Sequence, residues 1–295
     1  MIIPCYNVAA TSERLVTALL QQDLEAELIF VDDGSSDGTA EHLTALTADS
    51  DSARVLVHET NRGRAAARNI GVAAATGTVL LFLDADMEPE PDFVRVHAEA
   101  HRRSGVIGII STPVLEGLDP DDPYHQYLAT KRGAASLDPD EPVPFRYFII
   151  GYTSVKADAV RAVGGFDERF TYGEDIDFAY RLSQHYPGRL FLSKQAIVHH
   201  HNHGTLDDRL DKLRVFGRDN LPLLLAKHPE MAEAANLDFV GTTRTLKGHL
   251  KRWALQPALG RWLYRNVQRI PHALRFVGLR YLMASVVATA YRDTR

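Results

Sequence analysis

The chain has 295 residues, 45% of them hydrophobic, which is enough for one large domain with an additional part. Its single cysteine, Cys5, excludes a disulfide framework and favours a reducing, cytoplasmic compartment. No apolar run of about 18 residues and no signal peptide occur, so we expect neither a membrane span nor secretion.

The net charge of −5 is unevenly distributed. From residue 244 onward, eleven lysines and arginines face a single acid, so this tail carries +10 and residues 1–243 carry −15. The acidic body argues against nucleic acid as a partner. The basic tail favours an anionic surface.

Strands and helices alternate along the first third of the chain. We predict strands over 1–4, 27–31, 54–58 and 80–83, and helices from residue 12, over 39–46 and over 64–75. Such alternation is typical of βαβ units, so the sequence predicts an α/β fold with a mostly parallel sheet.

The composition shifts to Pro and Asp between residues 116 and 145, where only 124–131 reads as a short helix. Loops of this length are uncommon and often functional, so we predict a flexible loop over the face that carries the site. Order resumes at 147–151, and further elements follow: a helix near 156, a helix over 174–185 and a strand over 190–198. We predict one domain over 1–205 and a helical extension over 206–295.

Two acid pairs follow predicted strands: Asp84 and Asp86 after 80–83, and Asp32 and Asp33 after 27–31. Carboxylates at the end of a buried strand repel each other, and a bound cation compensates for this. Ligands also bind at this end of the strands in open α/β sheets. The structural alternative is that the acids only cap helices and form turns.

Five motifs stand in order along the chain: Ile2-Ile3-Pro4-Cys5-Tyr6-Asn7, Val31-Asp32-Asp33-Gly34-Ser35-Ser36-Asp37-Gly38-Thr39, Asn61-Arg62-Gly63-Arg64-Ala65-Ala66-Ala67-Arg68-Asn69-Ile70-Gly71, Phe82-Leu83-Asp84-Ala85-Asp86, and Gly164-Gly165-Phe166-Asp167-Glu168 leading to Gly173-Glu174-Asp175-Ile176-Asp177-Phe178. With them, residues 1–225 resemble the family 2 glycosyltransferases of the GT-A fold. The resemblance implies a Rossmann-like sheet flanked by helices. It also implies inverting, metal-dependent transfer of one sugar from a nucleotide-sugar donor, which we expect to be UDP-linked, to an acceptor hydroxyl.

The resemblance implies donor-binding roles for residues in three of these motifs. Pro4 and Tyr6 would border the nucleotide base, and Asp33 would accept a hydrogen bond from it; for Tyr6, core packing is the alternative. Arg64 would lie near the diphosphate, which a fixed positive charge suits. Arg68 would order the strand ends by pairing with the acids, with donor contact as the alternative.

The resemblance also implies a metal site at the Asp84-Ala85-Asp86 motif, which belongs to the donor site. Asp84 would approach the ribose, and Asp86 would bind Mg²⁺ or Mn²⁺ that bridges both phosphates. His200 would be a further metal ligand. His199 and His201 are its alternatives, although strand alternation places them on the opposite face.

Asp175 is the candidate general base for the acceptor hydroxyl, and Glu174 beside it is the candidate for acceptor binding. The helix that begins after Gly173 has a dipole that favours an ionised carboxylate at its first turn. The alternative is that Glu174, Asp175 and Asp177 only stabilise the helix start.

The tail combines apolar residues at helical spacing with a stripe of Arg261, Arg265 and Arg269. Such a helix suits an anionic membrane surface, and a lipid-linked acceptor would accompany it, as in glycolipid or cell-envelope glycan synthesis; a plain saccharide acceptor is the other option. The alternative is a helical hairpin packed on the catalytic domain or in a homodimer.

Two other functions remain open from the sequence. A sugar nucleotidyltransferase also needs a nucleotide-binding α/β fold and paired acids, but no glycine-rich phosphate loop with Lys or Arg follows the first strand. A non-catalytic module that binds nucleotide sugars or glycans is the second alternative, although the metal acids and the base are all present. Processive relatives carry Gln-x-x-Arg-Trp and membrane spans, which this sequence lacks.

Overall fold

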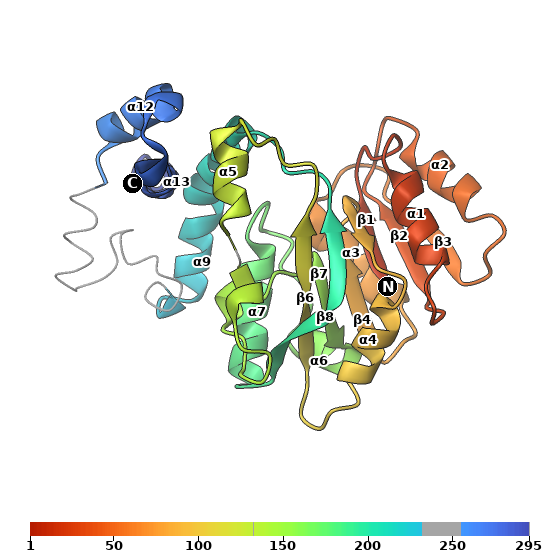
Figure 1. Cartoon of the computed structure of the whole chain (residues 1–295). Coiled ribbons are helices and arrows are strands. Elements are labelled where there is room, and N and C mark those ends of the chain that lie inside the picture. Colours follow the sequence, from red (N-terminus) through yellow and green to blue (C-terminus); the bar gives the residue numbers. More distant parts are fainter. Residues whose placement is uncertain (132, 232–254, 295) are drawn as a thin grey trace. The chain divides into compact units, whose positions relative to one another are not determined.

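The computed structural model describes residues 1–131, 133–231 and 255–294, in two compact units (Figure 1). Unit 1 comprises residues 1–117, 132–169 and 174–202, and unit 2 comprises 118–131, 170–173 and 203–295. The predicted domain bounds stay a prediction; the two units differ from them because 118–131 and 170–173 group with the C-terminal helices. The basic residues of 244–254 lie outside the described residues.

Unit 1 is built on an eight-stranded sheet with the order β3-β2-β1-β4-β7-β6-β8-β5. Parallel pairs join β3, β2, β1 and β4, and also β6 and β8. Antiparallel pairs join β7 to β4 and β6, and β5 to β8. The predicted α/β fold with a mostly parallel sheet is therefore confirmed. The strands are β1 (Ile2–Cys5), β2 (Leu28–Asp32), β3 (Ala53–Val57), β4 (Val79–Leu83), β5 (Met87–Pro89), β6 (Gly108–Leu115), β7 (Tyr152–Lys156) and β8 (Leu190–His200).

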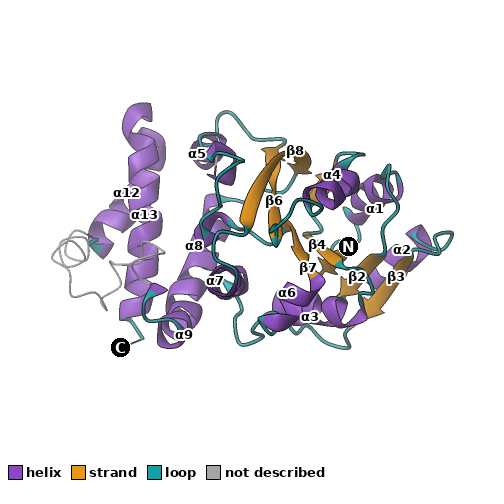
Figure 2. Ribbon diagram, turned by 90° about the horizontal axis from the view of Figure 1, so that it is seen from below, coloured by secondary structure: helices purple, strands orange, loops and turns teal. Residues whose placement is uncertain are grey.

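Helices cover both faces of this sheet: α1 and α4 lie on one side, and α3 and α6 on the other (Figure 2). The central strands are apolar because both of their faces are buried, as Ile2, Phe30 and Phe82 show at 0% exposure. The helices of unit 1 are α1 (Ser12–Leu20), α2 (Thr39–Leu46), α3 (Arg64–Ala74), α4 (Phe93–Ala100), α6 (Ala157–Ala162) and α7 (Glu174–His185), with short 3₁₀ turns η1 (Gly133–Ser136) and η2 (Phe145–Tyr147).

Order was expected to resume at 147–151, and the strand β7 begins directly after this segment, at Tyr152. Residues 145–147 form the turn η2, and Gly151 lies against Asp84, whose backbone N–H donates to the Gly151 carbonyl at 2.8 Å. A Cβ at Gly151 would lie 2.3 Å from Asp84 Oδ2. The chain can therefore enter β7 beside Asp84 only because residue 151 has no side chain.

Unit 2 is helical. Its elements are α5 (Pro123–Ala129), α8 (Leu206–Val215), the π-helical turn η3 (Phe216–Asn220), α9 (Leu221–Lys227), α12 (Pro257–Asn266), the 3₁₀ turn η4 (Val267–Arg269) and α13 (His272–Arg292). A capping box between Thr205 and Asp208 starts α8, and Asp122 caps α5. The helix α5 confirms the short helix predicted near 124–131. None of the helices described is both long enough and apolar enough to cross a membrane.

Candidate active site

The candidate residues gather at the edge of the unit 1 sheet where its parallel strands end, called here the carboxyl edge. Asp33 follows β2 and Asp84 follows β4, and both strands are parallel to β1. His200 ends β8, which runs in the same direction because two antiparallel steps, through β7 and β6, link it to β4. The sheet therefore brings these side chains to one edge, where ligands bind in open α/β folds.

The loops after β1 and β2 are joined by hydrogen bonds. The Asn7 N–H donates to Ser35 Oγ at 2.9 Å, and the Ser36 N–H donates to Asn7 Oδ1 at 3.0 Å. Asn7 has a left-handed backbone with φ +51°, which asparagine tolerates better than most residues. The neighbouring Tyr6 side chain remains half exposed, so it is not part of the core.

Asp33 is buried, and its carboxylate is hydrogen-bonded within the protein. Its Oδ1 lies 2.6 Å from His58 Nδ1 and accepts the Arg62 N–H at 3.0 Å, and its Oδ2 accepts the Gly63 N–H at 2.7 Å. The side chain thereby fixes the turn that leads into α3. These contacts occupy most of the carboxylate's acceptor sites, which limits its capacity for the predicted contact with a base.

Arg68 connects two acids from distant parts of the chain. Its Nη2 donates to Asp84 Oδ1 at 2.9 Å, its Nη1 donates to Glu174 Oε1 at 2.8 Å, and its guanidinium lies 5.5 Å from the Phe166 ring centroid. Burial disfavours the charge on Asp84, but the positive charges of Arg68 and Arg64 outweigh this and lower the pKa of its carboxyl group. Arg68 orders the acids, as predicted, and its 1% exposure argues against donor contact.

Glu174 is also buried, with 1% exposure, which argues against its predicted role in acceptor binding. Besides Arg68, Arg64 Nε lies 3.4 Å from its Oε1. Arg64 differs from Arg68 because 46% of its side chain is exposed. Its guanidinium is thus close to the buried acids and accessible to a ligand, as its predicted role near a diphosphate requires.

Asp86 and His200 lie together at the carboxyl edge, with 3.2 Å between Asp86 Oδ2 and His200 Nε2. The antiparallel pairing of β5 with β8 brings them together because Met87 is opposite His200. A carboxylate is the oxygen ligand that Mg²⁺ and Mn²⁺ prefer, and the imidazole adds a nitrogen. No cluster of three or more His, Cys, Asp or Glu suited to metal binding occurs among the described residues. Mg²⁺ sites with one or two carboxylates plus substrate phosphates are common, so this pair fits such an ion.

The flanking histidines have other partners. His199 Nδ1 lies 2.8 Å from Glu116 Oε1 and its Nε2 lies 2.8 Å from Glu90 Oε1, while His201 Nε2 lies 2.7 Å from Glu88 Oε2. Hydrogen bonding to Glu90, and then to Glu116, raises the pKa of His199. Neither ring contacts Asp86, so the geometry favours His200 over both alternatives.

Asp175 lies in the first turn of α7 and is partly buried, and its Oδ1 accepts the Ile176 N–H at 2.8 Å. Burial raises its pKa to about 6, and the negative charge of Glu174 adds to this, while Arg64 and Arg68 oppose it. The Ile176 N–H at the helix start lowers the pKa of this carboxyl group, as the dipole argument suggested, but burial outweighs it. A base with a pKa near 6 is ionised at neutral pH and can still accept a proton.

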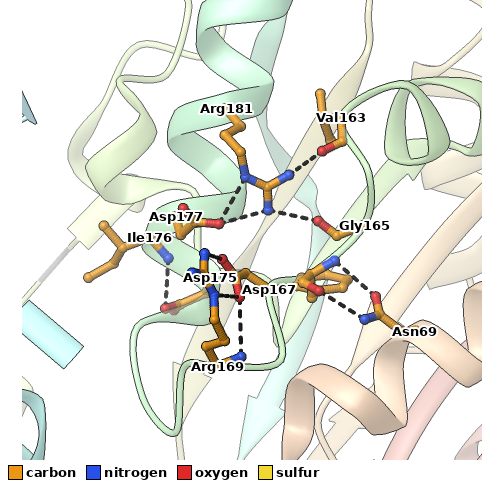
Figure 3. Close-up of polar contacts among 10 residues, drawn as sticks. Asn69, Val163, Gly165, Asp167, Arg169, Asp175, Ile176, Asp177 and Arg181 are labelled. Atoms are coloured by element: carbon orange, nitrogen blue, oxygen red, sulfur yellow. Dashed lines mark hydrogen bonds and ion pairs between the residues drawn. The ribbon is translucent and has the colours of Figure 1, made fainter. Parts of the chain in front are cut away.

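Asp177 holds the start of α7 against the preceding turn (Figure 3). Arg181 Nε donates to Asp177 Oδ2 at 2.8 Å, and the same guanidinium donates to the Val163 and Gly165 carbonyls. The Asn69 side chain of α3 exchanges two hydrogen bonds with the Phe166 backbone, at 2.8 and 2.9 Å. Asp177 is 0% exposed, which supports a structural role and leaves Asp175 as the accessible acid of the turn.

Comparison with known proteins shows which family this architecture belongs to. The model of the family named Glycosyl transferase family 2 matches residues 1–160. The chain belongs to this family. The family 2 chain is 29% identical over 302 residues to a pre-mycofactocin glycosyltransferase of Mycobacterium tuberculosis, an alignment that covers 98% of the chain and 60% of that relative. It therefore spans less than two thirds of the length of this relative.

Solved structures share the GT-A fold of the family 2 chain. A mannosyltransferase from Pyrobaculum calidifontis, in complex with GDP-Man and Mn²⁺, superposes with a TM-score of 0.63 at 18% identity. The alignment covers 99% of this chain and 86% of the mannosyltransferase chain. TarS from S. aureus, in complex with UDP-GlcNAc, has a TM-score of 0.60 at 15% identity and covers 99% of this chain and 90% of its own. At these identities the likeness concerns the fold.

Three features of the family 2 site were not predicted: the Asp33–His58 pair, the room that Gly151 leaves for Asp84, and the pairing of His199 with two glutamates. The first had a signal in the sequence. Asp33 and His58 each follow a strand, and the parallel register pairs Asp32 with Val57, so the next residues lie side by side. The other two depend on β7 and β5, whose positions the sequence did not indicate.

Proposed function

We propose that the family 2 chain transfers one sugar from a nucleotide-sugar donor to an acceptor hydroxyl, with inversion at the anomeric carbon and with a divalent metal ion. The observation that carries this proposal is the joint placement, at one edge of the sheet, of the Asp86–His200 pair and the Arg68-linked acids beside Asp175. Family membership supports the reaction class.

The donor would lie along the carboxyl edge. Tyr6 and Pro4 would border the base, Asp84 and Ala85 would lie near the ribose, and the exposed Arg64 guanidinium would pair with the diphosphate. We propose UDP as the nucleotide; GDP is the alternative, because the two structures compared above hold UDP-GlcNAc and GDP-Man. Asp33 would contribute by holding the turn before Arg64, and through its remaining acceptor capacity.

Asp86 and His200 would hold Mg²⁺ or Mn²⁺ together with the donor phosphates. A bound divalent ion supplies Lewis-acid stabilisation of the charge that develops on the departing nucleoside diphosphate. Arg64 adds a second positive charge on the protein side. No protein acid is then required to protonate the leaving group.

Asp175 would accept the proton of the acceptor hydroxyl as its oxygen attacks the anomeric carbon. The new bond forms on the face opposite to the diphosphate, the bond from the anomeric carbon to phosphate oxygen breaks, and its electron pair leaves with the nucleoside diphosphate. The configuration at the anomeric carbon is therefore inverted. Glu174 would not contact the acceptor in this proposal; it would hold Arg68 and raise the pKa of Asp175.

The acceptor is either a saccharide or a lipid-linked glycan, and we propose a peripheral association with the cytoplasmic face of a membrane. Leu259 and Trp262 of α12 are 44% and 55% exposed, and Arg261 and Arg265 of the same helix are exposed as well, which supports this association. Ile270, by contrast, is buried in unit 2. Co-sedimentation with phosphatidylglycerol vesicles tests the idea, which fails if Trp262→Ser with Leu259→Ser partitions like the wild type.

A donor panel tests the proposed reaction. The chain is incubated with Mn²⁺ and UDP-glucose, UDP-GlcNAc, UDP-galactose or GDP-mannose, and nucleoside diphosphate release is measured with and without simple glycoside acceptors. Release from one or two donors, stimulated by an acceptor, supports transfer. Binding of a donor without release would instead favour a non-catalytic module, and pyrophosphate release from UTP with a sugar phosphate would favour a nucleotidyltransferase.

A further inference from the structure

Unit 2 holds an open cavity of about 400 Å³, lined by residues of α8, η3, α12 and α13. This volume lies in the range of small-molecule sites, roughly 300–1,000 Å³. All of the lining residues belong to unit 2, and no residue of the carboxyl edge of unit 1 is among them. Neither the proposed donor site nor the proposed base accounts for it.

The cavity has an apolar interior. Leu210 and Leu282 line it and are themselves 1% and 3% exposed, and Val286 lies beside them. The hydroxyl groups in the lining are engaged, because Ser285 Oγ donates to the Leu282 carbonyl at 2.8 Å and Thr289 Oγ1 donates to the Ser285 carbonyl at 2.7 Å. The Tyr264 hydroxyl donates to Asp207 Oδ1 at 2.6 Å. These bonds leave no free hydroxyl proton toward the cavity, which suits a hydrocarbon chain.

Arginines from three elements border this interior: Arg214 of α8, Arg218 of η3 and Arg261 of α12. Arg214 pairs with Asp211 and Arg218 with Asp219, so two of the guanidinium charges are partly balanced. Arg261 makes no hydrogen bond or ion pair with any other residue that the structure describes. Asp293 is the one carboxylate of the lining, so the lining carries three positive charges against one negative.

The π-helical turn contributes to the shape of the cavity. Residues 216–220 interrupt the run of α-helix between α8 and α9, and Arg218 lies within this wider turn. Single π-helical turns occur often at functional sites. Gly217 of the same turn lies against α13, where a Cβ would be 2.7 Å from the Val287 carbonyl oxygen, so η3 and α13 are in close contact.

We propose that this cavity binds one molecule of a single-chain anionic amphiphile, with the hydrocarbon chain on the Leu210–Leu282 interior and the anionic headgroup on Arg261 and its neighbours. The headgroup is a phosphate or a carboxylate, since the guanidinium fork recognises both. Such a ligand has the chemistry of a lipid phosphate or a fatty acid. The inference does not rest on the proposed sugar transfer.

Calorimetric titration of the full chain with dodecyl phosphate, below its critical micelle concentration, tests the proposal. We expect saturable binding of one molecule per chain, with each methylene removed weakening binding about fourfold. Dodecanol and inorganic phosphate, which each lack one half of the ligand, should bind at least tenfold more weakly. The absence of saturable binding, or equal binding of inorganic phosphate, would overturn the proposal. Binding of dodecanoate tighter than that of dodecyl phosphate would support it and assign the carboxylate class.

Two variants on one helix separate the cavity from general charge attraction. Arg261→Glu should weaken dodecyl phosphate binding at least tenfold, whereas Arg265→Glu, an exposed residue that does not line the cavity, should leave it unchanged. Ala290→Leu, which narrows the cavity, should weaken binding of dodecyl phosphate while the circular dichroism spectrum of the protein stays constant. Equal losses of dodecyl phosphate binding in both arginine variants would assign the binding to a charged surface and contradict the cavity site. The same conclusion would follow if phosphatidylglycerol vesicles competed with dodecyl phosphate and both variants abolished this competition equally.

Discussion

Arg68 Nη1 donates a hydrogen bond of 2.8 Å to Glu174 Oε1, and both side chains are closed to solvent. Arg68 belongs to α3 and Glu174 to α7, so this ion pair joins two helices 106 positions apart in the sequence at the candidate active site. The same guanidinium holds Asp84. One buried positive charge therefore holds both Asp84 and Glu174.

Removal of Arg68 should strongly destabilise the fold. Arg68→Met removes the buried partner of Glu174 and leaves its carboxylate only the half-exposed Arg64, and breaking a buried pair in this way costs about 3–5 kcal/mol. Chemical denaturation measures the free energy of unfolding. The matched control is Arg62→Met, whose pair with Glu168 is exposed and should be worth at most about 1 kcal/mol. The double variant Arg68→Met with Glu174→Met should recover part of the loss; equal costs for Arg68→Met and Arg62→Met would contradict the buried pair.

The pH dependence of the reaction should reflect Asp175. With its pKa raised to about 6, this carboxyl group is ionised above that pH and protonated below it, so kcat/KM should fall about tenfold per pH unit on the acid side. Glu174→Gln removes a neighbouring negative charge and should move this acid limb to lower pH. A pH profile of nucleoside diphosphate release measures both, and an unchanged limb in Glu174→Gln would argue against Asp175 as the titrating group.

The free energy of unfolding should also depend on pH through Asp175, and the direction of this dependence can be predicted. Burial raises the Asp175 pKa from 3.8 to about 6, so between these values the folded chain holds a proton that the unfolded chain has lost. Ionisation at higher pH therefore costs folding free energy. Relative to wild type, Asp175→Asn should be more stabilising above pH 6 than near pH 4. Thermal unfolding at both pH values measures the difference, and the opposite sign would show that the carboxylate is stabilised in its ionised form.

Metal-dependent donor binding should require Asp86. The factor by which Mn²⁺ increases donor affinity should be about tenfold smaller in Asp86→Asn than in the wild type. The reason is that the variant lacks the carboxylate that would bind the ion. Glu88→Gln is the matched control, since Glu88 is two residues away and pairs with His201. Titration of UDP in the presence of Mn²⁺ or of EDTA measures the effect. If both variants respond alike, Asp86 has no special role with the ion.

Gly151 should be intolerant of a side chain. Its Cβ would lie 2.3 Å from Asp84 Oδ2, so Gly151→Ala should displace Asp84 from its contact with Arg68 and raise the KM for the donor. Gly77→Ala, where the nearest atom is 3.4 Å away, is the control and should leave the KM unchanged. An unchanged KM in Gly151→Ala would mean that Asp84 has no part in donor binding.

The sequence predicted most of the framework because its strands are short apolar runs with acids at their ends. Asp84 and Asp86 follow β4 as expected, and α2 and α7 have the predicted bounds. What could not be predicted depends on long-range pairing. The burial of Arg68 and Glu174 follows from the packing of α3 and α7 near the sheet, and the three separate histidine pairs follow from the register of β5 with β8. The Asp33–His58 pair, by contrast, had a signal in the sequence, because both residues follow strands that pair in parallel.

The most direct test of the proposed reaction is sugar transfer by Asp175→Asn, measured beside UDP binding with Mn²⁺. The account predicts a loss of about 10²–10⁴-fold in kcat, with the Kd for UDP and Mn²⁺ unchanged, because Asp175 acts on the acceptor proton and not on the donor. Asp158→Asn, an exposed acid on α6, serves as the control and should retain full activity. Near-normal turnover in Asp175→Asn would contradict the central claim.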